Sequence, residues 1–150
     1  MSADLIFSVC NYAVLPGWVL LIIFPKWKWT LALISAVITP FVLGLVYVGL
    51  FASQLGNFPE GGGLGSTQSL MITFSNSYIL TAAWIHYLAF DLFVGAWEVR
   101  DAQRQEISHW LVIPCLVFTF IAGPTGLVLY FICRFVVTKK YLLASPVGNL

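Results

Sequence analysis

Four long apolar runs, separated by short polar stretches, divide the sequence. Each run reaches the roughly 20 residues that a helix needs to cross the hydrocarbon core of a bilayer. None alternates apolar and polar residues as a barrel strand does, and backbone groups in lipid must be hydrogen-bonded within their own segment. The pattern predicts an all-α fold, an integral membrane bundle of four transmembrane helices forming a single domain over residues 1–150, with spans at about 5–24, 29–51, 70–96 and 110–137.

Prolines interrupt these runs and predict bent helices. A proline removes one backbone donor and favours a kink that neighbouring groups must repair. We expect such kinks at four positions, Pro16, Pro40, Pro114 and Pro124.

The three connections differ in character. The stretch "PKWKW" (25–29) places cations between indole rings, a pattern typical of an anchor at the headgroup level. The glycine-rich stretch 53–67 carries one charge, Glu60, and is either a flexible linker or a lid over a lipid-facing site. The polar stretch 98–109 either caps the third helix or prolongs it into water.

Composition supports a membrane protein surrounded by lipid. Hydrophobic residues make up 60% of the chain and charged residues 9%, whereas about 25% of the residues of a soluble domain are charged. The net charge of +1, with no basic stripe, excludes nucleic acid as an expected partner. Cys10, Cys115 and Cys133 lie in apolar sequence without CxxC spacing, so we interpret them as buried small hydrophobes.

The sequence also bears on processing of the N-terminus, on location and on oligomeric state. The N-terminus has no basic n-region and no clear cleavage site, so we expect the first helix to be retained. The expected location is an integral membrane position, in a bacterial inner membrane or, in a phototroph, a thylakoid or other plastid membrane. The oligomeric state is open, with a homo-oligomer as one option.

Both histidines and most acidic residues lie between Trp84 and His109. His86 and Asp91 are embedded in the third run, where an ionisable group costs several kcal/mol unless it faces protein or a cavity, and it is a functional-site hypothesis by default. Asp91 and Glu98, seven residues apart, share one helix face, and Asp101 is about 60° away.

A second helix has to complete such a site. His86 and Arg100 share a different face of the third helix, and the short connection would return His109 to the depth of Glu98 and Asp101. The candidate catalytic residues are therefore His86, Asp91, Glu98, Arg100, Asp101 and His109.

Four interpretations compete for these residues. The polar stretch can be a solvated helix end with an Asp101–Arg104 pair, and the embedded groups can be structural polar contacts between helices. The carboxyl groups can instead form an acid/base site. Iron, manganese or zinc would suit His, Asp and Glu, but the spacing matches neither HExxH nor the ligand sets of di-iron bundles, so no metal or other cofactor is predicted.

The last two runs carry a recognisable pattern. The stretch Trp84–Tyr130 resembles the small membrane protein family typified by the plant abscisic-acid-deficient-four protein, associated with neoxanthin synthesis. "VLPGW" and "FPKWKWT" in the first part of the chain are also similar to that family. The residues that fall on the pattern are His86, Asp91, Gly95, Trp97, Glu98, Arg100, Asp101, His109, Pro114, Cys115, Thr119, Phe120, Gly123, Pro124 and Gly126.

The resemblance implies conversion of the epoxide violaxanthin to the allene neoxanthin, an intramolecular isomerisation. This reaction needs a proton donor at the departing oxygen and a base for a carbon-bound proton, and formally no cofactor. We hypothesise Asp91 or Glu98 as acid or base, His86 and His109 as proton partners, and Arg100 as electrostatic support. The substrate can equally be another carotenoid or isoprenoid lipid, and the alternative function is a non-enzymatic carotenoid- or lipid-binding or membrane-assembly protein.

Overall fold

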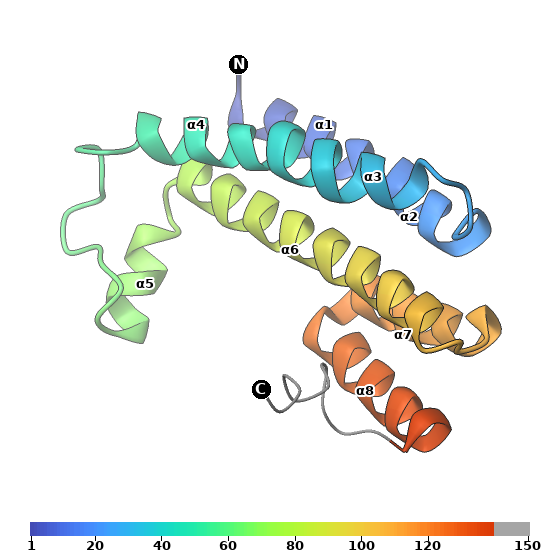
Figure 1. The fold of residues 1–150 in the computed structure, drawn as a ribbon. Helices are drawn as coiled ribbons and strands as arrows, with labels where there is room; N and C mark the ends of the chain where they lie inside the picture. Colours follow the sequence, from blue (N-terminus) through green and yellow to red (C-terminus); the bar gives the residue numbers. More distant parts are fainter. Residues whose placement is uncertain (140–150) are drawn as a thin grey trace, which may run out of the picture. The chain divides into compact units, whose positions relative to one another are not determined.

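Every element of the region that the structure describes is helical. The computed structural model describes residues 1–139, without the side chains of residues 35–37 and 40. The all-α prediction is confirmed for this region (Figure 1). The elements are α1 (Ala3–Ala13), α2 (Leu15–Ile23), α3 (Thr30–Leu33), the π-helix η1 (Ile34–Gly44), α4 (Leu45–Ser53), α5 (Thr67–Thr73), α6 (Ser77–Arg104), α7 (His109–Ala122) and α8 (Pro124–Thr138).

The chain groups into two compact units, and we describe each by itself. The first comprises residues 1–93 and the second begins at Val94, so α6 contributes to both. Within the described residues, two helical segments are long and apolar enough to cross a membrane: Ala3–Ile23, of 21 residues, and Ser77–Arg104, of 28 residues. The helices α7 and α8 fall below that length, at 14 and 15 residues.

The prediction of one helix over 110–137 is wrong. The chain reverses at Gly123, with φ 29° and ψ −90°, and α7 and α8 form a helical hairpin (Figure 1). Glycine tolerates positive φ, and the fixed φ of Pro124 suits the first turn of a new helix, so this dipeptide ends one helix and starts another. Hydropathy continues unbroken across the turn and hides it.

The other spans also differ from their predicted bounds. The first is divided at Val14, and Pro16 falls in the first turn of α2. The second is helical throughout, with Pro40 inside the π-helical section. In the third, the short α5 is separate and α6 runs to Arg104, so the polar stretch after Ala96 prolongs the helix.

A tight turn connects α6 to α7. Glu106 adopts a left-handed backbone conformation with φ 56°. The Ile107 amide donates to the Ala102 carbonyl at 2.9 Å, and the Glu106 amide donates to the Gln103 carbonyl at 3.4 Å. Ile107 is buried. These two hydrogen bonds make a Schellman motif, in which glycine is the usual left-handed residue.

In the first unit, other helices pack against the N-terminal part of α6. Trp84 Nε1 on α6 donates to Asn11 Oδ1 on α1 at 3.2 Å, and the Trp84 ring lies 5.8 Å from that of Phe7. Farther along, Gly17 on α2 faces Leu92, whose Cδ1 would lie 3.0 Å from a Cβ placed on the glycine. The small residue therefore allows α2 to approach α6 closely.

Candidate functional site

A buried polar cluster forms part of the core of the second unit. Its acidic members come from α6 and their partners come from α7 and α8. All five residues are at most 8% exposed. We call these residues the polar cluster: Glu98, Asp101, Thr119, Tyr130 and Arg134.

Asp101 receives two strong hydrogen bonds from α8. Arg134 Nε donates to Asp101 Oδ2 at 2.7 Å, and the Tyr130 hydroxyl donates to the same oxygen at 2.8 Å. The Tyr130 ring meets Trp97 edge to face, with the ring centroids 5.5 Å apart. A buried charge needs a partner of opposite sign and further hydrogen bonds, and Arg134 and Tyr130 provide both. The cation that pairs with Asp101 is therefore Arg134, and not Arg104 as in the interpretation of a solvated helix end.

Glu98 is the second acidic member of the polar cluster. It is fully buried, and the Thr119 hydroxyl donates to Glu98 Oε1 at 2.9 Å. Thr119 is held in place from the other side by Gly126, where an added Cβ would overlap the Thr119 backbone nitrogen and Oγ1. The close approach of α8 to α7 therefore fixes the hydroxyl that binds Glu98.

Asp91 lies in the first unit and differs from the polar cluster. It is 8% exposed, and the side chain of Tyr87, one helical turn earlier, hydrogen-bonds to its carboxyl group. Asp91 Oδ2 has no hydrogen-bond partner among the described residues. Tyr87 is only half-buried, so this pair is less enclosed than Glu98. A carboxyl group with one oxygen that has no hydrogen-bond partner, next to a phenol, can take up or release a proton.

The remaining predicted site residues are more exposed. His86 is exposed on α6, and its ring stacks on Phe90 at 4.5 Å between centroids. Arg100 is half-buried, and His109 is half-buried at the start of α7. Within residues 1–139, no three His, Cys, Asp or Glu side chains are grouped closely enough to hold a metal ion.

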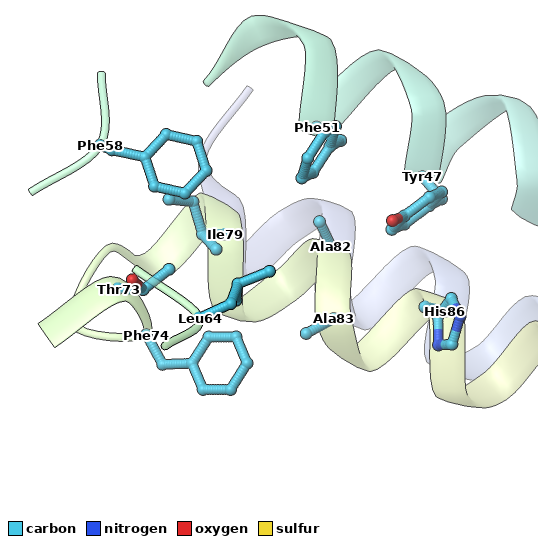
Figure 2. Close-up of a pocket in the computed structure, with 10 residues that line it drawn as sticks. All are labelled: Tyr47, Phe51, Phe58, Leu64, Thr73, Phe74, Ile79, Ala82, Ala83 and His86. Carbon is cyan, nitrogen blue, oxygen red and sulfur yellow. The ribbon is translucent and has the colours of Figure 1, made fainter. Parts of the chain in front are cut away.

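An apolar pocket of about 280 Å³ lies in the first unit, between α4, α6 and the segment that joins them (Figure 2). Tyr47 and Phe51 come from α4, and Phe58 and Leu64 come from the glycine-rich stretch. His86 lies at the same end of the pocket as Tyr47 (Figure 2). The other lining residues are Thr73, Phe74, Ile79, Ala82 and Ala83.

Residues 54–76 form a defined cover over this pocket, which we call the cover segment. Asn76 Nδ2 donates to Gln54 Oε1 at 2.9 Å and joins its two ends. Inside it, the Gly63 amide donates to Thr73 Oγ1 at 2.7 Å, and Ser66 and Ser69 form a capping box that starts α5. Since Phe58, Leu64, Thr73 and Phe74 all line the pocket, the cover segment has the placement of a lid and is not a featureless linker.

Sequence reasoning missed several of these residues as functional candidates. Arg134 is a lone arginine in the apolar run 124–138, and such a residue usually pairs with a buried acid. Tyr87 precedes Asp91 by four residues, a spacing at which helical side chains meet. Both signals are visible in the sequence, whereas the hydrogen bond between Glu98 and Thr119 depends on the packing of α7 against α6.

Comparison with known proteins identifies the family. The family described as ABA DEFICIENT 4-like matches residues 5–130. Protein ABA DEFICIENT 4, chloroplastic, of Arabidopsis thaliana is 28% identical over 153 residues, which cover 93% of this chain and 64% of that protein. No solved structure matches the chain. Because the family match covers most of the chain and includes all the predicted site residues, the resemblance is confirmed and this protein belongs to the ABA4-like family.

Proposed function

We propose that this protein is an integral membrane enzyme that isomerises an epoxy-carotenoid to an allenic alcohol, with Asp91 and Tyr87 as the acid/base pair. Membership of the ABA4-like family supports a carotenoid as the substrate. The two span-length apolar helices support a membrane location, where such a substrate dissolves. The observation that carries the assignment is the hydrogen-bonded Asp91–Tyr87 pair with its uncommitted carboxylate oxygen.

The proposed reaction balances without a redox partner. Asp91 takes a proton from the carbon next to the epoxide, and the C–H electron pair forms the second double bond of the allene. The C–O bond breaks, and the oxygen receives the Tyr87 hydroxyl proton. Asp91 then returns its proton to Tyr87 through their hydrogen bond, which resets both groups. Each proton transfer of this kind contributes about 10²–10⁴-fold to the rate.

In this proposal the polar cluster is structural, because its hydrogen bonds join the end of α6 to α7 and α8. Glu98 is fully buried and binds Thr119, and Asp101 binds Arg134 and Tyr130. A reacting group must lie within hydrogen-bond reach of the substrate. Glu98 has no exposed surface and Asp101 is bound by Arg134 and Tyr130, so we assign neither to the reaction. Catalytic roles for His86, Arg100 and His109 stay predictions, as does assembly into a homo-oligomer.

The test is to express the full chain in a carotenoid-producing bacterium supplied with violaxanthin and other epoxy-carotenoids, and to separate the pigments by chromatography. We expect a new pigment of unchanged mass with the wild type, none with Asp91→Asn, and about 10²-fold less with Tyr87→Phe. Tyr12→Phe, at an exposed tyrosine on α1, is the matched control and should behave as the wild type. Near-normal turnover by correctly folded Asp91→Asn would overturn the proposal.

A second candidate function is non-enzymatic carotenoid binding, which the apolar pocket favours. In that case a carotenoid co-purifies with the protein and its structure is unchanged. Asp91→Asn would then leave the amount of bound pigment unaltered, since Asp91 does not line the pocket.

A further inference from the structure

The pocket between α4 and α6 has Tyr47 and His86 at one end, and its other lining residues are apolar except Thr73. Figure 2 shows Tyr47 and His86 at one end and Phe58 and Phe74 at the other. The Tyr47 and His86 rings lie 5.6 Å apart between centroids, inclined at 53°. An apolar cavity with a few convergent polar groups is the usual form of a small-molecule site.

The polar groups at that end are available to a ligand. Among the described residues, neither the Tyr47 hydroxyl nor the His86 imidazole forms a hydrogen bond; both make ring contacts instead. A hydroxyl group of a ligand can donate to one of these side chains and accept from the other. The arrangement therefore suits an apolar molecule that ends in an alcohol.

The size of the pocket restricts which part of a ligand it takes. Its volume of about 280 Å³ is near the lower limit of ligand pockets, which enclose about 300–1,000 Å³. A six-membered ring with its methyl groups suits this volume, whereas a complete long polyene exceeds it. Phe51, Phe58 and Phe74 supply aromatic faces for such a ring.

The cover segment contributes four of the ten residues that line the pocket. Its ends are joined by the Gln54–Asn76 hydrogen bond, and the Thr73 hydroxyl accepts from the Gly63 amide. Gly62 permits this approach, because a Cβ there would lie 2.8 Å from the Pro59 carbonyl oxygen and 2.9 Å from Thr73 Oγ1. The wall that carries Phe58 is thus built by specific contacts.

From these features we infer that the pocket binds the hydroxylated end ring of a carotenoid, with Tyr47 and His86 holding the ring hydroxyl group and the cover segment enclosing the ring. The choice of a carotenoid rests on the proposed function, whereas the preference for a hydroxylated ring comes from the pocket itself.

The test compares two probes that differ only in their hydroxyl groups: a carotenoid with a hydroxyl on each ring and the corresponding hydrocarbon carotenoid. Each is titrated into the full chain in lipid nanodiscs, and binding is followed by quenching of tryptophan fluorescence. We expect the hydroxylated probe to bind at least tenfold more tightly. The double variant Tyr47→Phe/His86→Phe should reduce that ratio to near one and still bind the hydrocarbon.

A filling variant tests the location of the site. Ala83→Trp places an indole in the pocket and should abolish binding of both probes, whereas Ala52→Trp, at an exposed position on α4, should not. Thermal unfolding of both variants checks that they fold. Equal binding of the two probes by the wild type, which is the behaviour of a site for lipid acyl chains, would overturn the inference, as would normal binding by Ala83→Trp.

Turnover of violaxanthin, added to the same nanodisc preparations, separates this inference from the proposed function. Hydroxyl-dependent binding without turnover would refute the isomerase and leave the pocket assignment intact. Turnover that depends on Asp91, with an unchanged KM in the Tyr47→Phe/His86→Phe variant, would refute the pocket assignment and leave the isomerase intact.

Discussion

Gly126 on α8 lies so close to Thr119 on α7 that a Cβ on the glycine would overlap both the backbone nitrogen and the hydroxyl oxygen of the threonine. The same Thr119 hydroxyl donates to Glu98 at 2.9 Å. The separation of the two helices and the geometry of a buried carboxyl group are therefore set at one point of contact.

We expect Gly126→Ala to destabilise the protein. Alanine is favoured over glycine in a helix by about 1 kcal/mol, but overpacking a close contact costs about 1–3 kcal/mol, and here backbone atoms must move. Gly49→Ala on α4 is the matched control, because nothing lies within 4 Å of its added Cβ. Thermal unfolding in detergent should show a lower Tm for Gly126→Ala and an unchanged or higher Tm for Gly49→Ala. Similar shifts for both would contradict the close packing of the hairpin.

Removing the guanidinium from the polar cluster should be costly. Arg134→Met leaves the buried Asp101 carboxylate without its cation, and breaking one side of a buried pair typically costs about 3–5 kcal/mol. Adding Asp101→Asn removes the uncompensated charge and should recover much of the loss in the free energy of unfolding. The control Arg104→Met replaces an exposed arginine and should change stability by less than about 0.5 kcal/mol. Additive effects of Arg134→Met and Asp101→Asn would show that the ion pair contributes little.

Glu106→Gly should stabilise the turn after α6. A left-handed conformation costs a residue with a Cβ about 1–2 kcal/mol, and Glu106 has φ 56°. Part of the gain is offset because glycine has more freedom in the unfolded chain, so a net gain of up to about 1 kcal/mol is expected. Glu106→Ala, which removes the charge but keeps the Cβ, is the control, and chemical denaturation gives the comparison. If alanine stabilises as much as glycine, the charge and not the backbone conformation is responsible.

The two functions of Asn76 can be separated. Its Oδ1 accepts from the amides of Tyr78 and Ile79 at 2.9 and 3.3 Å, which starts α6, and its Nδ2 donates to Gln54. Asn76→Ala should lose both contacts, including a cap that typically contributes about 1 kcal/mol, whereas Gln54→Ala should lose only the contact that closes the cover segment. Hydrogen exchange should therefore accelerate at the Tyr78 and Ile79 amides in Asn76→Ala alone. Equal acceleration in both variants would mean that the cap depends on the closure.

The sequence allows the helical class and the family to be predicted, because long apolar runs and a motif-rich stretch are local signals. It also places Asp91 correctly as a buried acid. The partner of Asp101 could not be predicted from helix spacing, because Arg134 is 33 residues away and becomes a neighbour only through the hairpin at Gly123. The pocket was likewise hidden, since its walls come from α4, α6 and an irregular segment that has no periodic pattern.

The Asp101–Arg134 pair has a consequence for the synthesis of the chain. Arg134 lies close to the end of α8 and beyond the last residue of the family match, residue 130. A ribosome that has completed α6 and α7 has produced both acidic members of the polar cluster but not their cation. The second unit can therefore reach its final packing only after nearly the whole described chain has emerged, and until then a charged Asp101 needs contact with water or lipid headgroups.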